Sequence, residues 1–141
     1  MEVKRVMPDE ADRLMRDGYT YVDVRSESEW ESGHAPASVN IPVAFLVPGQ
    51  GFAPNRDFVA VCERNFGKDA KLLVGCKTGA RSHRAAEMLQ AAGFTDVRDV
   101  CGGMMGEMSP TGQLVPGWAA RGLPVTRECP PEQSYPALAK G

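Results

Sequence analysis

The chain has 141 residues, of which 43% are hydrophobic and 24% are charged, and its formal net charge is −2. This is the composition of an ordinary globular protein, and the length suits one domain around a single core. No apolar stretch approaches the roughly 20 residues that a membrane-spanning helix needs. Residues 1–5 lead into no apolar signal segment, which favours the cytoplasm.

The cysteines and histidines exclude two further classes of protein. None of Cys62, Cys76, Cys101 and Cys129 forms a Cys-x-x-Cys pair, and the two histidines supply no metal-ligand spacing. A disulfide framework is not expected in a chain of this length with an ordinary core. We therefore expect reduced cysteines, one of which is functional.

Predicted strands and helices alternate along the chain. Strands are expected at residues 3–6, 19–24, 37–42, 71–74 and 96–100, and helices from Pro8 to a stop at Gly18 and at residues 27–32, 57–66, 82–92 and 116–121. Residues 43–56, rich in proline and glycine, predict a loop. The alternation predicts an α/β fold, with a central parallel sheet that carries helices on both faces. We expect a single domain over residues 1–126 and an irregular tail over residues 127–141.

The most informative stretch joins the strand at residues 71–74 to the helix at residues 82–92. Cys76 stands where the strand ends, in the run Val74-Gly75-Cys76-Lys77-Thr78-Gly79-Ala80-Arg81-Ser82 that opens the helix. Backbone N–H groups at a helix N-terminus lack intrahelical acceptors, and the helix dipole adds partial positive charge there. Such a place favours an anion, and the reactive form of a cysteine is the thiolate anion.

The side-chain charges near Cys76 are positive, as is the partial charge at the helix N-terminus. From Cys76 to Arg84 the cations are Lys77, Arg81 and Arg84, and no acidic residue occurs. A basic loop on a chain of net negative charge indicates a small anionic substrate, not a nucleic acid. The competing interpretation is that Cys76 is a small buried hydrophobe, as cysteines at strand ends commonly are.

Three blocks of sequence resemble one protein family. The run Cys76-Lys77-Thr78-Gly79-Ala80-Arg81-Ser82 resembles the active-site loop of rhodanese domains, which are sulfurtransferases. The N-terminal rhodanese signature is similar to Asp23-Val24-Arg25, Glu29-Trp30, Gly33-His34-Ala35 and Val39-Asn40-Ile41-Pro42, and the C-terminal one to Val100-Cys101-Gly102-Gly103, Trp118 and Gly122-Leu123-Pro124-Val125. Together the blocks cover about residues 3–126 in family order. Trp118 lies farther from the double glycine than in the family, which makes residues 104–116 an expected loop insertion.

The resemblance implies sulfur transfer in two steps and a rhodanese-like fold. The Cys76 thiolate takes the outer sulfur of a donor such as thiosulfate as a persulfide, and cyanide or a thiol then accepts that sulfur. The expected substrate-binding residues are Lys77, Thr78, Gly79, Ala80, Arg81 and Ser82. Their N–H groups would cradle the terminal sulfur anion. Arg81 would either attract the donor or clasp the loop, and Ser82 would be either a helix cap or a ligand.

Asp23 and Arg25 are interpreted as residues that support the Cys76 loop. They end the strand at residues 19–24, and the carboxyl ends of parallel strands share one edge of a sheet. The alternative is a charge pair satisfied at the strand end. His34 is expected to be structural, because an activated thiolate needs no histidine base. Cys101 is expected to be a packed residue and not a resolving thiol.

Two other functions stay open at this point. Phosphatases and arsenate reductases use a similar cysteine loop with one residue more than the six from Cys76 to Arg81, which makes a wider cradle. Non-catalytic rhodanese-like binding modules commonly lack the loop cysteine, which is present here. No metal or organic cofactor is implied. The expected partners are a small anionic sulfur donor and a thiol or cyanide acceptor, with a protein as another acceptor; neither nucleic acid nor a membrane is expected.

Overall fold

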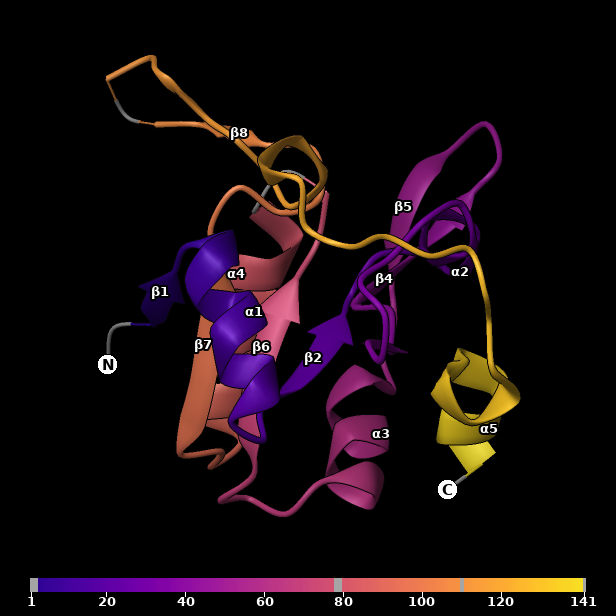
Figure 1. Cartoon of the computed structure of the whole chain (residues 1–141). Coiled ribbons are helices and arrows are strands. Elements are labelled where there is room, and N and C mark those ends of the chain that lie inside the picture. Colours follow the sequence, from indigo (N-terminus) through magenta and orange to yellow (C-terminus); the bar gives the residue numbers. More distant parts are fainter. Residues whose placement is uncertain (1–2, 78–79, 110, 141) are drawn as a thin grey trace.

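The computed structural model describes residues 3–77, 80–109 and 111–140, and a parallel sheet lies at its centre (Figure 1). In spatial order its strands are β1 (Lys4–Val6), β7 (Asp96–Val100), β6 (Lys71–Gly75), β2 (Thr20–Asp23) and β3 (Val39–Asn40). Every neighbouring pair is parallel. The carboxyl ends of all five strands therefore lie at one edge of the sheet, where ligands bind in open α/β folds.

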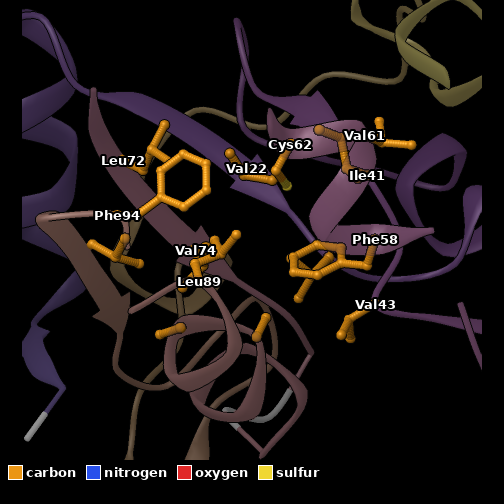
Figure 2. Packing of buried hydrophobic residues seen from close by; sticks show 14 of the residues in the cluster. Val22, Ile41, Val43, Phe58, Val61, Cys62, Leu72, Val74, Leu89 and Phe94 are labelled. Carbon is orange, nitrogen blue, oxygen red and sulfur yellow. The ribbon is translucent and has the colours of Figure 1, made fainter. Parts of the chain in front are cut away.

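Helices cover both faces of this sheet, as predicted. They are α1 (Pro8–Arg16), α2 (Glu27–Glu31), α3 (Phe58–Asn65) and α4 (Ala80–Ala91), followed by a short α5 (Tyr135–Lys140). Side chains alternate between the faces of a strand, so Leu72 and Leu73 of β6 point to opposite sides. Leu72 packs in one buried cluster with Phe58 of α3 and Leu89 of α4 (Figure 2), whereas Leu73 packs in the other with Ala11 of α1. Within the described residues, no helix combines the length and the apolar character that crossing a bilayer requires.

The first turn of α2 holds the carboxylate of Glu29 in a fixed direction. Ser26 and Glu29 form a capping box, in which each side chain bonds the backbone N–H of the other residue. Two N–H groups of the first turn, which have no intrahelical acceptor, are satisfied in this way. The reciprocal bonds also fix the direction of the Glu29 side chain.

The prediction of a loop over residues 43–56 is wrong. This segment contains β4 (Ala44–Val47) and β5 (Gly51–Pro54), which pair as an antiparallel hairpin. The breakers Pro48 and Gly49 are confined to its turn, where Gly49 has the left-handed φ of 76°. Pro54 is tolerated because a two-stranded ribbon has an unpaired side at every strand. The base of the hairpin is held by Asn55, whose side chain donates to the Pro42 carbonyl over 2.8 Å.

The predicted insertion at residues 104–116 also contains a hairpin, formed by β8 (Glu107–Met108) and β9 (Leu114–Val115). Both hairpins extend beyond the sheet edge that holds the strand ends (Figure 1). The helix expected at residues 116–121 is reduced to a 3₁₀ turn, Ala119–Arg121, which ends at Gly122 with a φ of 76°.

The tail after residue 126, predicted to be irregular, contains a 3₁₀ turn at Pro131–Gln133 and the helix α5. The prolines of the tail indicated a broken chain, but Pro131 and Pro136 occupy first turns, where a missing N–H is not needed. Leu138 of α5 is buried in the cluster that contains α3, and its carbonyl accepts a bond from Asn65 over 2.9 Å. Packing against α3 therefore orders this segment.

Candidate active site

Cys76 lies at the carboxyl end of the central strand, close in sequence to the start of α4. β6 ends at Gly75 and α4 begins at Ala80, so Cys76 is the first residue after the strand. The Cys76 side chain is 1% exposed and belongs to the same apolar cluster as Val74 and Val43. Two predicted site residues, Thr78 and Gly79, lie outside the described residues. The arrangement presents a thiol at a helix N-terminus in apolar surroundings, which is a setting for nucleophilic chemistry.

The chain at Cys76 and Lys77 packs closely against Gly103 and the two residues that follow it. The N–H groups of Met104 and Met105 donate to the carbonyls of Cys76 and Lys77 over 2.8 Å and 2.9 Å. A Cβ atom on Gly103 would lie 2.5 Å from the Cys76 carbonyl oxygen, and φ at this residue is +53°. Only glycine therefore lets the two segments approach this closely.

A buried hydrogen-bond chain runs from Cys76 into the sheet. The Cys76 Sγ donates to Ser82 Oγ over 3.5 Å, and Ser82 Oγ donates to Asp99 Oδ1 over 2.5 Å. Arg5 Nε donates to the other oxygen of Asp99 over 3.0 Å. Burial raises the pKa of Asp99, although the bonds from Ser82 and Arg5 act in the opposite direction. The chain thus connects the thiol to a carboxylate that is itself held by a cation.

This hydrogen-bond chain contains residues that the sequence analysis missed. The position of Ser82 in α4 also rules out the helix cap, one of the two roles left open for this residue. Ser82 is the third residue of α4, so it is not the cap of that helix. Asp99 was missed, although a carboxylate one residue before the end of a predicted strand is a signal that the sequence displays. Arg5 was missed too; it reaches Glu107 of the β8–β9 hairpin over 2.6 Å and so connects that hairpin to the site.

Arg81 is held by a carboxylate of α2. Its Nη1 and Nη2 atoms donate to the two oxygens of Glu29 over 2.8 Å and 3.0 Å, which is a bidentate pair. The guanidinium also stacks on Phe52 of β5, 4.3 Å from the ring centroid. We call the Arg81–Glu29 pair the clasp, because it ties the first turn of α4 to α2, and bonds from Arg81 to the loop itself stay a prediction. The sequence analysis named Glu29 only within the signature and gave it no role at the site, although the capping-box spacing from Ser26 could have drawn attention to it.

The Glu29 pair predicts a defined dependence of stability on pH. Although burial raises the pKa of Glu29, the bonds from Arg81 and Ser26 lower it to about 2 from an ordinary 4.5. A depressed carboxyl pKa gives stability that is complete above the unfolded pKa and lost as pH falls toward the folded one. We therefore expect Glu29→Gln to lower the free energy of unfolding by roughly 2 kcal/mol at neutral pH. Urea unfolding should show this deficit shrinking as the pH falls from about 4.5 toward 2.

The matched control for this prediction is Glu27→Gln. Glu27 is an acid of the same first helical turn, and no ion pair of Glu27 occurs within the described part of the chain. A deficit for Glu29→Gln that stayed constant with pH, or one equal to that of Glu27→Gln, would contradict the ion-pair explanation.

Asp23 and Arg25 form a buried pair with each other at the end of β2. Arg25 Nη2 donates to Asp23 Oδ2 over 2.8 Å and to the Gly33 carbonyl over 2.7 Å. The Glu29 carboxylate attracts the Arg25 guanidinium, and Arg25 repels Arg81. The Asp23–Arg25 pair therefore interacts electrostatically with the Arg81–Glu29 pair. Support for the Cys76 loop by this pair stays a prediction.

The remaining predicted residues fall into three places. Lys77 is exposed, and Ala80 is the exposed first residue of α4. His34 is buried and stacked on Trp30, with centroids 3.9 Å apart, and its Nδ1 lies 2.6 Å from the Trp30 carbonyl. That position agrees with a structural role. Cys101 is partly buried at the end of β7, where burial raises the pKa of its thiol.

The chain is similar to proteins of one family. Residues 7–106 match the family model described as Rhodanese-like domain. Thiosulfate sulfurtransferase 16, chloroplastic, of Arabidopsis thaliana is 36% identical over 112 residues, which cover 79% of this chain and 82% of that protein. Senescence-associated protein DIN1 of Raphanus sativus is 37% identical over 93 residues, 66% of this chain and only 50% of that protein. The solved structure of Rv0390 from M. tuberculosis has a TM-score of 0.74 at 27% identity, over 91% of this chain and 100% of that one.

Proposed function

We propose a sulfurtransferase activity for this chain, which belongs to the family of rhodanese-like domains. The observation that carries the proposal is the position of Cys76, at the end of the central strand and at the N-terminus of α4, beside the clasped Arg81. A relative of 36% identity that is named thiosulfate sulfurtransferase supports it. The cytoplasmic location stays a prediction, since that relative is a chloroplastic protein.

In the first proposed step, the Cys76 thiolate attacks the outer sulfur of thiosulfate. The new bond joins the Cys76 sulfur to the outer sulfur, the sulfur–sulfur bond of thiosulfate breaks, and its electron pair leaves with sulfite. N–H groups of the first turn of α4, which have no acceptor within the helix, and the charge of Lys77 would stabilise the anionic donor and the terminal sulfur of the persulfide. In the second step, cyanide or a thiolate takes that sulfur and the Cys76 thiolate returns.

Within this proposal, Ser82 and Asp99 are positioning residues. Ser82 accepts from the thiol and donates to Asp99, so the carboxylate fixes the orientation of the hydroxyl that faces the sulfur. Asp99 therefore holds Ser82 Oγ in place beside the Cys76 sulfur, and the bond from Arg5 holds Asp99 in turn.

Asp99→Asn is expected to lower the rate of sulfur loading from thiosulfate by roughly tenfold. The substitution removes the charged acceptor that fixes the Ser82 hydroxyl beside the Cys76 sulfur. The measurement is the gain of one sulfur atom in the intact mass against time after thiosulfate is added. Asp96→Asn is the control, because Asp96 lies on the same strand but pairs with Arg98 and Tyr19. An unchanged loading rate for Asp99→Asn, or an equal loss for Asp96→Asn, would sink this role.

The test of the function itself is the intact mass of the protein after incubation with thiosulfate and desalting without reductant. We expect a gain of one sulfur atom that cyanide reverses, with thiocyanate as the product. If thiosulfate, mercaptopyruvate and glutathione persulfide all fail to add sulfur, the chain is not a sulfurtransferase of this type and a binding module becomes the better proposal.

A further inference from the structure

A cavity of about 550 Å³ lies beside the Cys76 loop, between α4, α2 and the β4–β5 hairpin. Its apolar wall includes Val43, Phe52 and Met88, and its basic residues outside the clasp are Lys77 and Arg84. Val43 and Met88 also pack in the buried cluster that contains Cys76, and Lys77 is the next residue in the chain. The lining of the cavity therefore includes the residue that follows Cys76 and two residues of the cluster that holds its side chain.

The charge of the cavity is positive. Arg81 lines it too, but Glu29 offsets that charge through the bidentate pair. Among the described residues, neither Lys77 nor Arg84 forms an ion pair with a carboxylate. Two cations are thus available to a ligand, next to a wall of carbon atoms. This combination selects an anion that also has an apolar body.

The cavity is much larger than the smallest expected substrates require. Cavities of roughly 300–1,000 Å³ commonly hold organic ligands of many atoms. Cyanide and thiosulfate are far smaller than 550 Å³ and have no carbon chain to place against Phe52, which is 48% exposed. If these were the only substrates, the apolar side of the cavity formed by the β4–β5 hairpin would contact no carbon chain of a substrate.

We propose that this cavity binds an organic thiol with a terminal carboxylate, as the sulfur acceptor, and this rests on the proposed sulfurtransferase function. The carboxylate lies at Arg84 and Lys77, and the carbon chain lies against Phe52 and Met88. The acceptor thiolate attacks the outer sulfur of the Cys76 persulfide. A new sulfur–sulfur bond forms on the acceptor, the bond to Cys76 breaks, and its electron pair returns to Cys76 as the thiolate.

The experiment measures single-turnover sulfur transfer from protein that has already been loaded with thiosulfate. The acceptors are three terminal thiols: mercaptohexanoate, the neutral mercaptohexanol of equal chain length, and the short anion mercaptopropionate. Mercaptohexanoate is expected to react about fivefold faster than mercaptohexanol at subsaturating concentration, because of its carboxylate. It is also expected to react roughly fivefold faster than mercaptopropionate, because of its longer apolar chain.

Two variants and one control locate these preferences in the cavity. Arg84→Gln should reduce the preference for mercaptohexanoate over mercaptohexanol, and Phe52→Ala the preference for the long anion over the short one. Arg64→Gln removes the same charge from exposed α3 and should change neither ratio. Equal rates for the three thiols, or ratios that Arg84→Gln and Phe52→Ala leave unchanged, would overturn the proposal. Failure of the protein to load with any donor would instead overturn the sulfurtransferase function, so the two failures are distinguishable.

Discussion

Cys76→Ser is expected to abolish persulfide formation and to lower sulfur transfer from thiosulfate to cyanide by at least about 10³-fold. A serine hydroxyl is not ionised at neutral pH, and it forms no stable bond with the outer sulfur of the donor. The measurement pairs the intact mass after thiosulfate treatment with the rate of thiocyanate formation. Both readouts should fall together, because one atom carries the sulfur through both steps.

Cys101→Ser provides the matched control for that result. Cys101 lies at the end of the neighbouring strand β7, and burial raises the pKa of its thiol, which disfavours the reactive thiolate. The variant should gain one sulfur atom from thiosulfate, as we expect of the unmodified chain. A Cys76→Ser protein that still gains sulfur, or a Cys101→Ser protein that does not, would show that the carrier has been misassigned.

Gly103→Ala is expected to lower the rate of sulfur transfer by roughly 100-fold, because it displaces the chain that carries Cys76. The added Cβ would lie 2.5 Å from the Cys76 carbonyl oxygen and 2.7 Å from the Lys77 carbonyl carbon. Both contacts are to backbone atoms, which cannot rotate away as a side chain can. Urea unfolding should show a loss of roughly 1–3 kcal/mol as well.

Gly112→Ala separates the steric effect from the conformational one. Gly112 also has a left-handed φ, +84°, but a Cβ there would meet no atom within 4 Å among the described residues. Its alanine variant should therefore show the cost of the φ angle without displacement of Cys76. If the two variants lose the same activity, the contact between the double glycine and the Cys76 loop is not what positions the sulfur.

Features of the fold that depend on neighbouring residues could be predicted from the sequence. The apolar run of β6, the helix formers of α4 and the glycine between them placed Cys76 at a strand end before a helix. The alternation of strands and helices predicted the parallel sheet with two covered faces, and this prediction is confirmed. These signals are local, because periodicity and turn residues act over a few positions.

Local signals were least informative where short elements contain breakers. The prolines and glycines of residues 43–56 predicted a loop, but strand pairing across the hairpin overrides the weak propensity of each strand. The prolines after residue 126 predicted an irregular tail, but burial of Leu138 against the rest of the core stabilises α5. In both segments the stabilising contacts join residues that are not neighbours in the sequence, and the propensity of single residues does not reflect such contacts.

The side chains that surround Cys76 could be identified only from the tertiary structure. Arg81 and its partner Glu29 are 52 residues apart, and Arg5 and Asp99 are 94 residues apart. The order β1-β7-β6-β2 brings these segments together, with Arg5 beside Asp99 and Asp99 beside Val74 in register. A single sequence carries no direct signal for such pairs, because strand order is set by how the helices and strands pack over the whole core. The candidate nucleophile, Cys76, could therefore be predicted from its own loop, whereas the clasp, the hydrogen-bond chain and the cavity wall required the fold.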